Sequence, residues 1–178
     1  MIFGNPETFA VEIGELMNFP GFPGTYIQFR FWVGNVPIGD WNDRISLRAS
    51  TESAFRICEA ELERNNNPFD QAETAELFKS IYEAYFSCDY INDPVSWRSL
   101  SAFYHLDQIG MGAIEDKFGL ILVTTKIGME RVIVKDLKKS LFLADISMPI
   151  GFVESILRDY IAWGRNQLDV GDICASKI

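Results

Sequence analysis

The chain has one histidine, His105, in the aromatic stretch Phe103-Tyr104-His105-Leu106. Histidine is the side chain whose ordinary pKa suits it to general acid–base catalysis near neutral pH. Such catalysis would pair His105 with a nucleophilic Ser or Cys, and no recognisable motif places one beside it. A single histidine within an aromatic strand is more often a hydrogen-bonded structural residue, so we predict a structural role for His105.

Metal and phosphate sites are predicted to be absent. The three cysteines, Cys58, Cys88 and Cys174, are far apart and form no C-x-x-C pair, whereas a zinc site needs about four suitably spaced ligands. The segment 109–112, Ile-Gly-Met-Gly, lacks the Gly-Lys-Ser/Thr of a phosphate loop and the third glycine of a dinucleotide fingerprint. We therefore expect a plain loop there, no metal and no cofactor, and Cys58 and Cys88 as reduced thiols in or near the core.

Acidic residues give the strongest charge signal. The chain has 25 Asp and Glu against 16 Lys and Arg, a net charge of -9. That much negative potential repels nucleic-acid backbones and anionic membrane surfaces, so we expect neither as a partner. Pairs such as Glu59 and Glu63, or Glu115 and Asp116, could imitate a catalytic acid and base. A solvated charged face, or a face on which something basic docks, is the simpler interpretation.

Two tryptophans in predicted loops are candidate interface anchors. Trp41 lies in Gly39-Asp40-Trp41-Asn42-Asp43, and Trp97 follows Asn92-Asp93-Pro94. Tryptophan is enriched among residues that dominate binding energy, although either side chain could equally cover the edge of the core. With acids of the polar helix faces and adjoining loops, they form the predicted partner-binding set: Asp40, Trp41, Asp43, Glu59, Glu63, Glu73, Glu76, Glu83, Asp89, Asp93 and Trp97.

Alternation of apolar and polar residues predicts the strands. A first strand with Phe9, Val11 and Ile13 on its buried face follows the Asn5-Pro6 turn. The stretch 19–26, with two prolines and two glycines, is expected to have no regular structure. A second strand over 25–33 leads through a Gly34-Asn35 hairpin to a short edge partner. Further strands are predicted over 100–106, 118–125, 129–134 and 141–146.

Helical spacing predicts three helices, from 50 or 51 to about 64, from about 70 to 87, and from 149 with a frayed tail after 168. Asp70-x-x-Glu73 resembles a capping box for the second. The first is expected to bury Phe55, Cys58 and Leu62. Strands and helices in separate blocks predict an α+β fold, with a largely antiparallel sheet packed with about three helices, in a single domain over 1–178.

The opening residues predict no secretory leader. No Lys or Arg precedes Arg30, and Glu7 and Glu12 interrupt any apolar run. The longest apolar run, 118–123, has the length of a buried strand and is too short for a membrane span. With the sparse cysteines, these features predict a cytoplasmic protein.

The opening MIFGNPETFAVEI resembles the N-terminal signature of the immunity protein 42 family, a Met-Ile-Phe-Gly-(acid or Asn)-Pro-x-x-Phe-Ala run. The passage 143–160 is similar to the family in general pattern. The resemblance implies a cytoplasmic antidote without catalytic residues. It would bind and neutralise the C-terminal domain of a contact-dependent or polymorphic toxin, encoded by the adjacent gene. The matching positions are Met1, Ile2, Phe3, Gly4, Pro6, Phe9 and Ala10.

Two other classes of protein stay open at this stage. One is a small cytoplasmic enzyme of unfamiliar type that uses His105 with Glu or Asp, and the other is an adaptor in a larger assembly. Many toxins of polymorphic systems are nucleases with basic clefts, and an acidic partner gains association rate and specificity by covering one. The expected partner is therefore a basic toxin surface.

Overall fold

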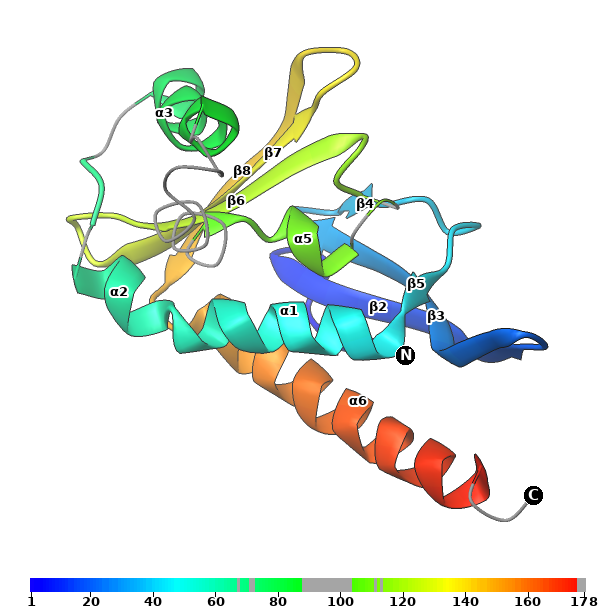
Figure 1. Cartoon of the computed structure of the whole chain (residues 1–178). Helices are drawn as coiled ribbons and strands as arrows, with labels where there is room; N and C mark the ends of the chain where they lie inside the picture. Colours follow the sequence, from blue (N-terminus) through cyan, green and yellow to red (C-terminus); the bar gives the residue numbers. More distant parts are fainter. Residues whose placement is uncertain (67, 71–72, 88–103, 111, 113, 176–178) are drawn as a thin grey trace.

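The chain forms two antiparallel sheets flanked by helices (Figure 1). The computed structural model describes residues 1–66, 68–70, 73–87, 104–110, 112 and 114–175. The first sheet has the order β1 (Ile2–Gly4), β2 (Phe9–Phe19), β3 (Phe22–Val33), β4 (Val36–Ile38), with β5 (Ile45–Ser46) also paired to β3. The second has the order β6 (Phe118–Thr124), β7 (Met129–Asp136), β8 (Leu141–Pro149). The predicted α+β class with antiparallel pairing is confirmed; its division into two sheets was not predicted.

Among the described residues, three long helices lie close to their predicted positions. The predicted first helix is divided into α1 and the short α2, and the short α5 was not predicted. The helices are α1 (Leu47–Glu59), α2 (Glu61–Asn66), α3 (Thr74–Ser87), α5 (Asp107–Gly110) and α6 (Phe152–Ala175). In Figure 1, α1 and α6 run past each other on one side of the molecule, and α3 lies on the other. The last helix begins three residues after Pro149, which ends β8 instead of opening the helix, and it continues beyond the predicted end at 168.

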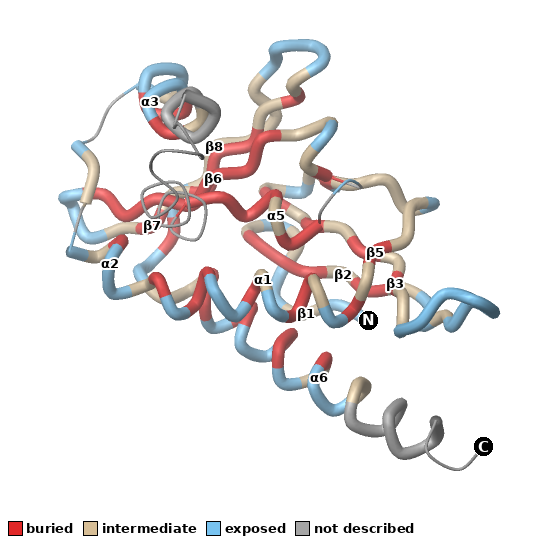
Figure 2. Tube along the Cα trace, in the orientation of Figure 1, coloured by how far each residue is buried: buried red, intermediate tan, exposed pale blue. Residues whose placement is uncertain are grey.

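The main core lies between the first sheet, α1 and α6. Phe9, Val11 and Ile13 point into it from β2, and the alternate residues 27, 29, 31 and 33 point into it from β3, as predicted. Tyr160 of α6 packs against Phe29, with ring centroids 5.7 Å apart. Figure 2 shows the buried residues of both helices on the sides that face the sheets.

Strand β6 of the second sheet is buried on both faces. Leu120 and Leu122 of β6 belong to the main core, whereas Ile121 and Val123 belong to a smaller cluster under α3. The α3 residues of that cluster are Leu77, Phe78 and Ile81. A strand covered on both faces has no polar side to show, which explains why 118–123 is continuously apolar.

The first helix begins earlier than predicted. The Ser46 side chain accepts a hydrogen bond from the Ala49 amide and caps the helix, so residues 50 and 51 lie one turn inside it. There, Ser50 Oγ bonds to the Tyr160 hydroxyl at 2.5 Å, and Thr51 Oγ1 donates to the Leu47 carbonyl at 2.7 Å. Serine and threonine residues that resemble caps are here contacts between two helices.

The buried face of α1 also differs from the prediction. Cys58 is buried as expected, but Phe55 is 40% exposed and Leu62, which lies in α2, is 70% exposed. The reason is the close approach of α6: a β carbon on Gly164 would lie 2.6 Å from Thr51 Oγ1. The side of α1 that meets α6 therefore carries small residues rather than Phe55.

The stretch 19–26 was wrongly expected to lack regular structure. Strands β2 and β3 stay paired to Phe19 and Phe22, and only residues 20 and 21 form the turn. The register shifts between Asn18 and Phe19, so Pro23 and Gly24 are extra residues on β3. A bulge of this kind accommodates a proline, which has no N–H to give to a ladder.

Three further local predictions need correction. Asp70 does not cap α3, which begins four residues later. Asp70 instead forms an ion pair with Lys126 at 2.7 Å. At the start of α3, the Thr74 hydroxyl donates a hydrogen bond to Asp145. Residues 109 and 110 belong to α5 rather than to a loop. Of the predicted strand 100–106, only 104–106 lie among the described residues, where His105 forms an isolated bridge to Ile121.

Candidate partner-binding surface

Residues 39–44, between β4 and β5, carry three predicted site residues. The Lys117 ammonium donates to Asp40 Oδ2 at 3.3 Å and to Asp43 Oδ2 at 3.1 Å. The Asn42 amide also donates to Asp40, and this bond together with Lys117 lowers the pKa of the Asp40 carboxyl. Both carboxylates remain partly exposed. A partner would therefore meet two acids that are ordered and already share one cation.

Trp41 lies on the outer face of the first sheet. The Arg30 guanidinium carbon is 4.4 Å from the centroid of the Trp41 ring and 4.7 Å from that of Trp32. Glu12 Oε2 accepts from Arg30 Nε at 2.6 Å and from Trp32 Nε1 at 2.7 Å. Partial burial alone would raise the pKa of Glu12, but these hydrogen bonds hold it below its usual value. We call Glu12, Arg30, Trp32 and Trp41 the Trp–Arg cluster.

Residues of β2 and β3 fix the position of Trp41. Gln28 donates from Nε2 to the Trp41 carbonyl at 3.1 Å. A β carbon on Gly14 would lie 2.9 Å from the indole and 2.2 Å from the Gln28 amide oxygen, so glycine leaves the space that the ring covers. Trp41 is half-buried here: it covers the sheet and still presents part of its surface. Its role as an interface anchor stays a prediction.

The sequence contained a signal for the Trp–Arg cluster that was not used. The polar side of the 25–33 strand carries Gln28, Arg30 and Trp32, and arginine and tryptophan are the residue types most enriched at interface hot spots. The cross-strand partner of Arg30 is Glu12, which supplies the carboxylate. The residue types at alternate positions of this strand are enough to suggest Arg30 and Trp32 as interface residues.

The predicted acids on the helices are exposed but lie away from Trp41. Glu59 ends α1, Glu63 lies in α2, and Glu73 and Glu76 lie at the start of α3. In Figure 1, α2 and α3 are on the left of the molecule, and the segment between β4 and β5 is on the right. The set is therefore divided between two regions. The Glu83 side chain and Asp89, Asp93 and Trp97 lie outside the described residues.

An exposed apolar tip was also missed. Leu16, Phe19 and Phe22 are exposed at the end of the β2–β3 hairpin, and the Phe19 ring packs against Tyr26 at 5.4 Å. Figure 2 shows this hairpin as an exposed projection from the sheet. Contiguous exposed apolar residues mark interaction sites more often than chance, and this tip continues the two strands that carry the Trp–Arg cluster.

His105 is 1% exposed, and its Nδ1 lies 3.5 Å from Asp107 Oδ1. A general base must reach the substrate proton that it removes, so this burial favours the structural interpretation. Cys58 is a buried free thiol, and burial raises its pKa to about 12. A thiol in that state is not a nucleophile near neutral pH.

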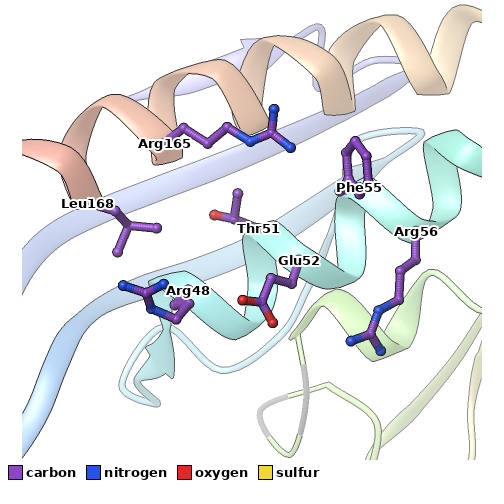
Figure 3. A pocket seen from close by; sticks show the side chains of 7 residues that line it. All are labelled: Arg48, Thr51, Glu52, Phe55, Arg56, Arg165 and Leu168. Carbon is purple, nitrogen blue, oxygen red and sulfur yellow. The ribbon is translucent and has the colours of Figure 1, made fainter.

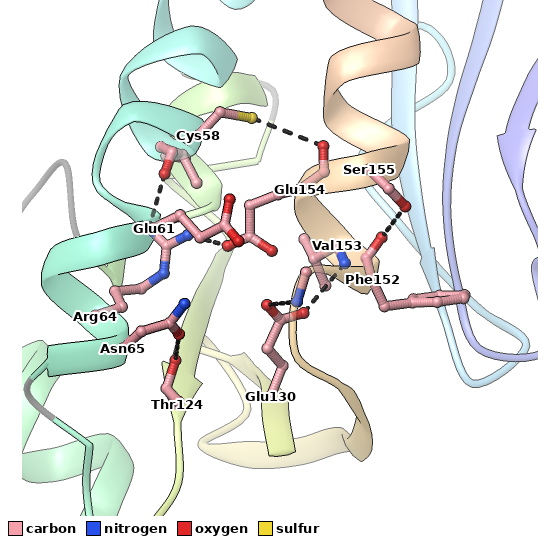
Figure 4. Close-up of polar contacts among 12 residues, drawn as sticks. Cys58, Glu61, Arg64, Asn65, Thr124, Glu130, Phe152, Val153, Glu154 and Ser155 are labelled. Carbon is pink, nitrogen blue, oxygen red and sulfur yellow. Dashed lines mark hydrogen bonds and ion pairs between the residues drawn. The ribbon is translucent and has the colours of Figure 1, made fainter. Parts of the chain in front are cut away.

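The most perturbed acid of the described chain lies in a buried polar network (Figure 4). Arg64 forms a buried ion pair with Glu154 and donates from Nη1 to the Ile57 carbonyl at 2.8 Å. Glu130 accepts from the amides of Gly151 at 2.6 Å and of Val153 at 3.1 Å, at the start of α6. Burial and the neighbouring Glu154 raise the pKa of Glu130 to about 8.

This network stabilises the fold and does not form a reaction site. It links α2, β7 and α6, and its side chains are closed off from solvent. Within the described parts of the chain, no three His, Cys, Asp or Glu side chains are grouped so as to hold a metal ion. None of the helices described there has the length and apolar character needed to cross a bilayer.

Comparison with known proteins gives two matches. The model of the family described as Immunity protein 42 matches residues 1–163. Among solved structures, the chain is similar to CdiI from Burkholderia dolosa AUO158, with a TM-score of 0.62 and 15% sequence identity. That match covers 91% of this chain and 99% of the other, and at this identity it shows a shared fold. No curated protein matches.

Proposed function

Since the chain belongs to the immunity protein 42 family, we propose that it binds the toxic domain of one cognate bacterial toxin and neutralises it. The observation that carries this proposal is the family match, which extends the resemblance of the first ten residues to positions 1–163. The shared fold with a chain named CdiI supports the same function. The toxin domain is expected to be the C-terminal domain of a protein encoded by the adjacent gene, and the encounter to take place in the cytoplasm.

We propose neutralisation by occlusion rather than by chemistry. The burial of His105 and Cys58 supports this choice over the enzyme alternative, because neither side chain can reach a substrate. The net charge of -9 favours a toxin with a basic surface, such as a nuclease, since opposite potentials accelerate encounter. The Trp–Arg cluster and the hairpin tip offer ordered aromatic groups for the centre of the interface.

Expression in a sensitive bacterium is expected to protect it from the toxin domain encoded beside this gene and not from an unrelated toxin. The His105→Gln variant is expected to protect equally, because blocking by occlusion needs no proton transfer. Colony survival after toxin induction measures both. Survival equal to that with an empty vector would end the immunity proposal. Loss of protection by His105→Gln, with unchanged melting and toxin binding, would favour the enzyme alternative.

The Trp41→Ala variant is expected to dissociate from the toxin domain about 30-fold faster, which corresponds to roughly 2 kcal/mol for an anchor residue. Surface plasmon resonance between about 50 and 500 mM salt measures both rate constants. Salt should slow association of every variant, because exposed charges are screened beyond about 8 Å at physiological ionic strength.

The matched control is Ile127→Ala, which truncates an exposed apolar side chain in the β6–β7 turn. It should leave dissociation unchanged. Equal dissociation of Trp41→Ala and the parent protein would limit Trp41 to covering the sheet. An association rate that does not respond to salt would remove the argument from net charge.

A further inference from the structure

A groove with a volume of about 440 Å³ lies between α1 and α6 (Figure 3). The two helices are in contact at Thr51 and Gly164, and in Figure 1 they diverge toward the end of α6. Exposed residues of α1 and the Arg165 turn of α6 form its walls. The lining residues are Arg48, Thr51, Glu52, Phe55, Arg56, Arg165 and Leu168.

The groove has the opposite charge to the protein as a whole. It is lined by three arginines and one glutamate, in a chain with 25 acids against 16 basic residues. Arg165 extends from α6 toward Phe55, and its guanidinium carbon lies 4.9 Å from the centroid of that ring. A guanidinium stacked on a ring keeps its N–H donors in its own plane, where they can bind a carboxylate in the bidentate manner.

The groove also has an apolar component. Phe55 is 40% exposed, although its size and its position on the helix led us to predict that it is buried. Leu168 lines the groove from the other helix. The volume lies within the range of about 300–1,000 Å³ found for ligand pockets, which is room for one or two side chains of a partner. Cations around an apolar floor suit a segment with carboxylates on either side of an apolar residue.

We propose that this groove receives an acidic segment of the cognate toxin domain, whose carboxylates pair with Arg48 and Arg165 while an apolar side chain packs on Phe55. This inference rests on the proposed function and names a second contact region, separate from the Trp–Arg cluster, and the chemistry of the partner segment that it receives. It complements the expectation of a basic toxin surface. The net negative charge steers the encounter at long range, and this local basic groove fixes the register of the two proteins.

A phosphate backbone is the other anion that arginines bind. The net charge of -9 opposes it, because a nucleic acid carries charge along its whole length and is repelled by the surrounding acidic surface. A short acidic segment within a basic toxin surface does not meet that repulsion. The observations therefore favour a protein segment.

The decisive experiment reverses the charge of the groove. In Arg48→Glu/Arg165→Glu, two cations become anions, and the affinity for the inactivated toxin domain is expected to fall about 100-fold or more, since two charge pairs are replaced by repulsion. The control Lys138→Glu/Lys139→Glu makes the same charge change at the exposed β7–β8 turn. It should weaken binding by less than about threefold, through long-range attraction alone. Isothermal titration calorimetry measures both.

Each outcome has a distinct meaning. If the parent protein binds the toxin domain and the two double variants weaken binding equally, the groove is not a contact region and this inference is overturned, whereas the proposed function stands. If the parent protein does not bind the toxin domain at all, the proposed function itself fails. Binding of a single-stranded oligonucleotide that Arg48→Glu/Arg165→Glu abolishes would overturn the inference in favour of nucleic acid. Partial retention of toxin binding by Arg48→Lys/Arg165→Lys would support bidentate pairing of these arginines with carboxylates, because lysine keeps the charge but cannot form the bidentate pair.

Discussion

Replacing Arg64 with methionine is expected to lower the free energy of unfolding by about 3–5 kcal/mol. The side chains of Arg64 and Glu154 are buried, and the ion pair is the charge compensation that Figure 4 shows for Glu154. Without the guanidinium, Glu154 would be a buried carboxylate beside a second buried acid, Glu130. The variant would also leave the Ile57 carbonyl without its Arg64 donor. Urea denaturation at neutral pH measures the loss.

Two further variants make this prediction specific. Arg158→Met removes the ion pair to Glu61 on the surface, where Arg158 is exposed, and should cost less than about 1 kcal/mol. The double variant Arg64→Met/Glu154→Met removes both buried charges and should recover much of the stability lost by Arg64→Met. A double variant as unstable as the single one would show that the arginine stabilises through packing and its bond to Ile57, not through charge compensation.

The stability of the protein is expected to fall as the pH rises from about 4.5 to about 8. Glu130 has a pKa of about 8 in the folded chain, against the ordinary 4.5. Between these values the folded state holds a proton that the unfolded state has released, so each pH unit lowers the free energy of unfolding by up to about 1.4 kcal/mol. The sign is set by the raised pKa. The stabilisation from Glu130 is fully present below its ordinary pKa of 4.5, and it is lost as the pH rises through its pKa of about 8 in the folded chain.

The Glu130→Gln variant should remove most of this slope, because an uncharged amide replaces the carboxyl that must ionise. Glu12→Gln is the matched control. The pKa of Glu12 is lowered by Arg30 and Trp32, so its contribution is lost on acidification and its replacement should leave the slope above about pH 5 unchanged. Urea denaturation midpoints across this range decide the matter. Equal slopes for Glu130→Gln and the parent protein would contradict the assignment.

Helices and strands were predictable where the apolar and polar residues of a segment alone determine its secondary structure and its buried side. The strand over 25–33 has a strict alternation, and its apolar half is buried as the period requires. The 118–123 run was predictable as a buried strand. The length of the run could not show that the two faces of β6 belong to different apolar clusters. One is the main core, which also contains residues of α1 and α6, and the other is the cluster under α3.

Errors arose where a second element decides the outcome. The choice between Phe55 and Ala54 as the buried side of α1 depends on how closely α6 approaches, and Gly164, which allows that approach, is more than 100 residues away. The 19–26 hairpin depends on a register shift that admits Pro23. Neither event has a local pattern in the sequence.

The candidate site was predictable in residue type more than in arrangement. Asp40, Trp41 and Asp43 lie on one segment, but Lys117 pairs with both acids and Arg30 stacks on the indole, and both contacts are long-range. A buried Arg64 paired with Glu154 runs against the rule that charged side chains stay exposed, so sequence alone would not suggest it. The single-domain organisation over 1–178 stays a prediction.

The contact of Phe3 with Tyr160 and Trp163 joins the first strand to the last helix, with ring centroids 6.2 and 6.0 Å apart. During synthesis, α1 can cover only part of the apolar side of the first sheet, and the part that α6 covers stays exposed until α6 has left the ribosome. At about 5–20 residues per second, that interval is on the order of ten seconds or more. A nascent chain is thus expected to need chaperones during translation, and a cell that begins to make this protein gains active molecules only after this delay.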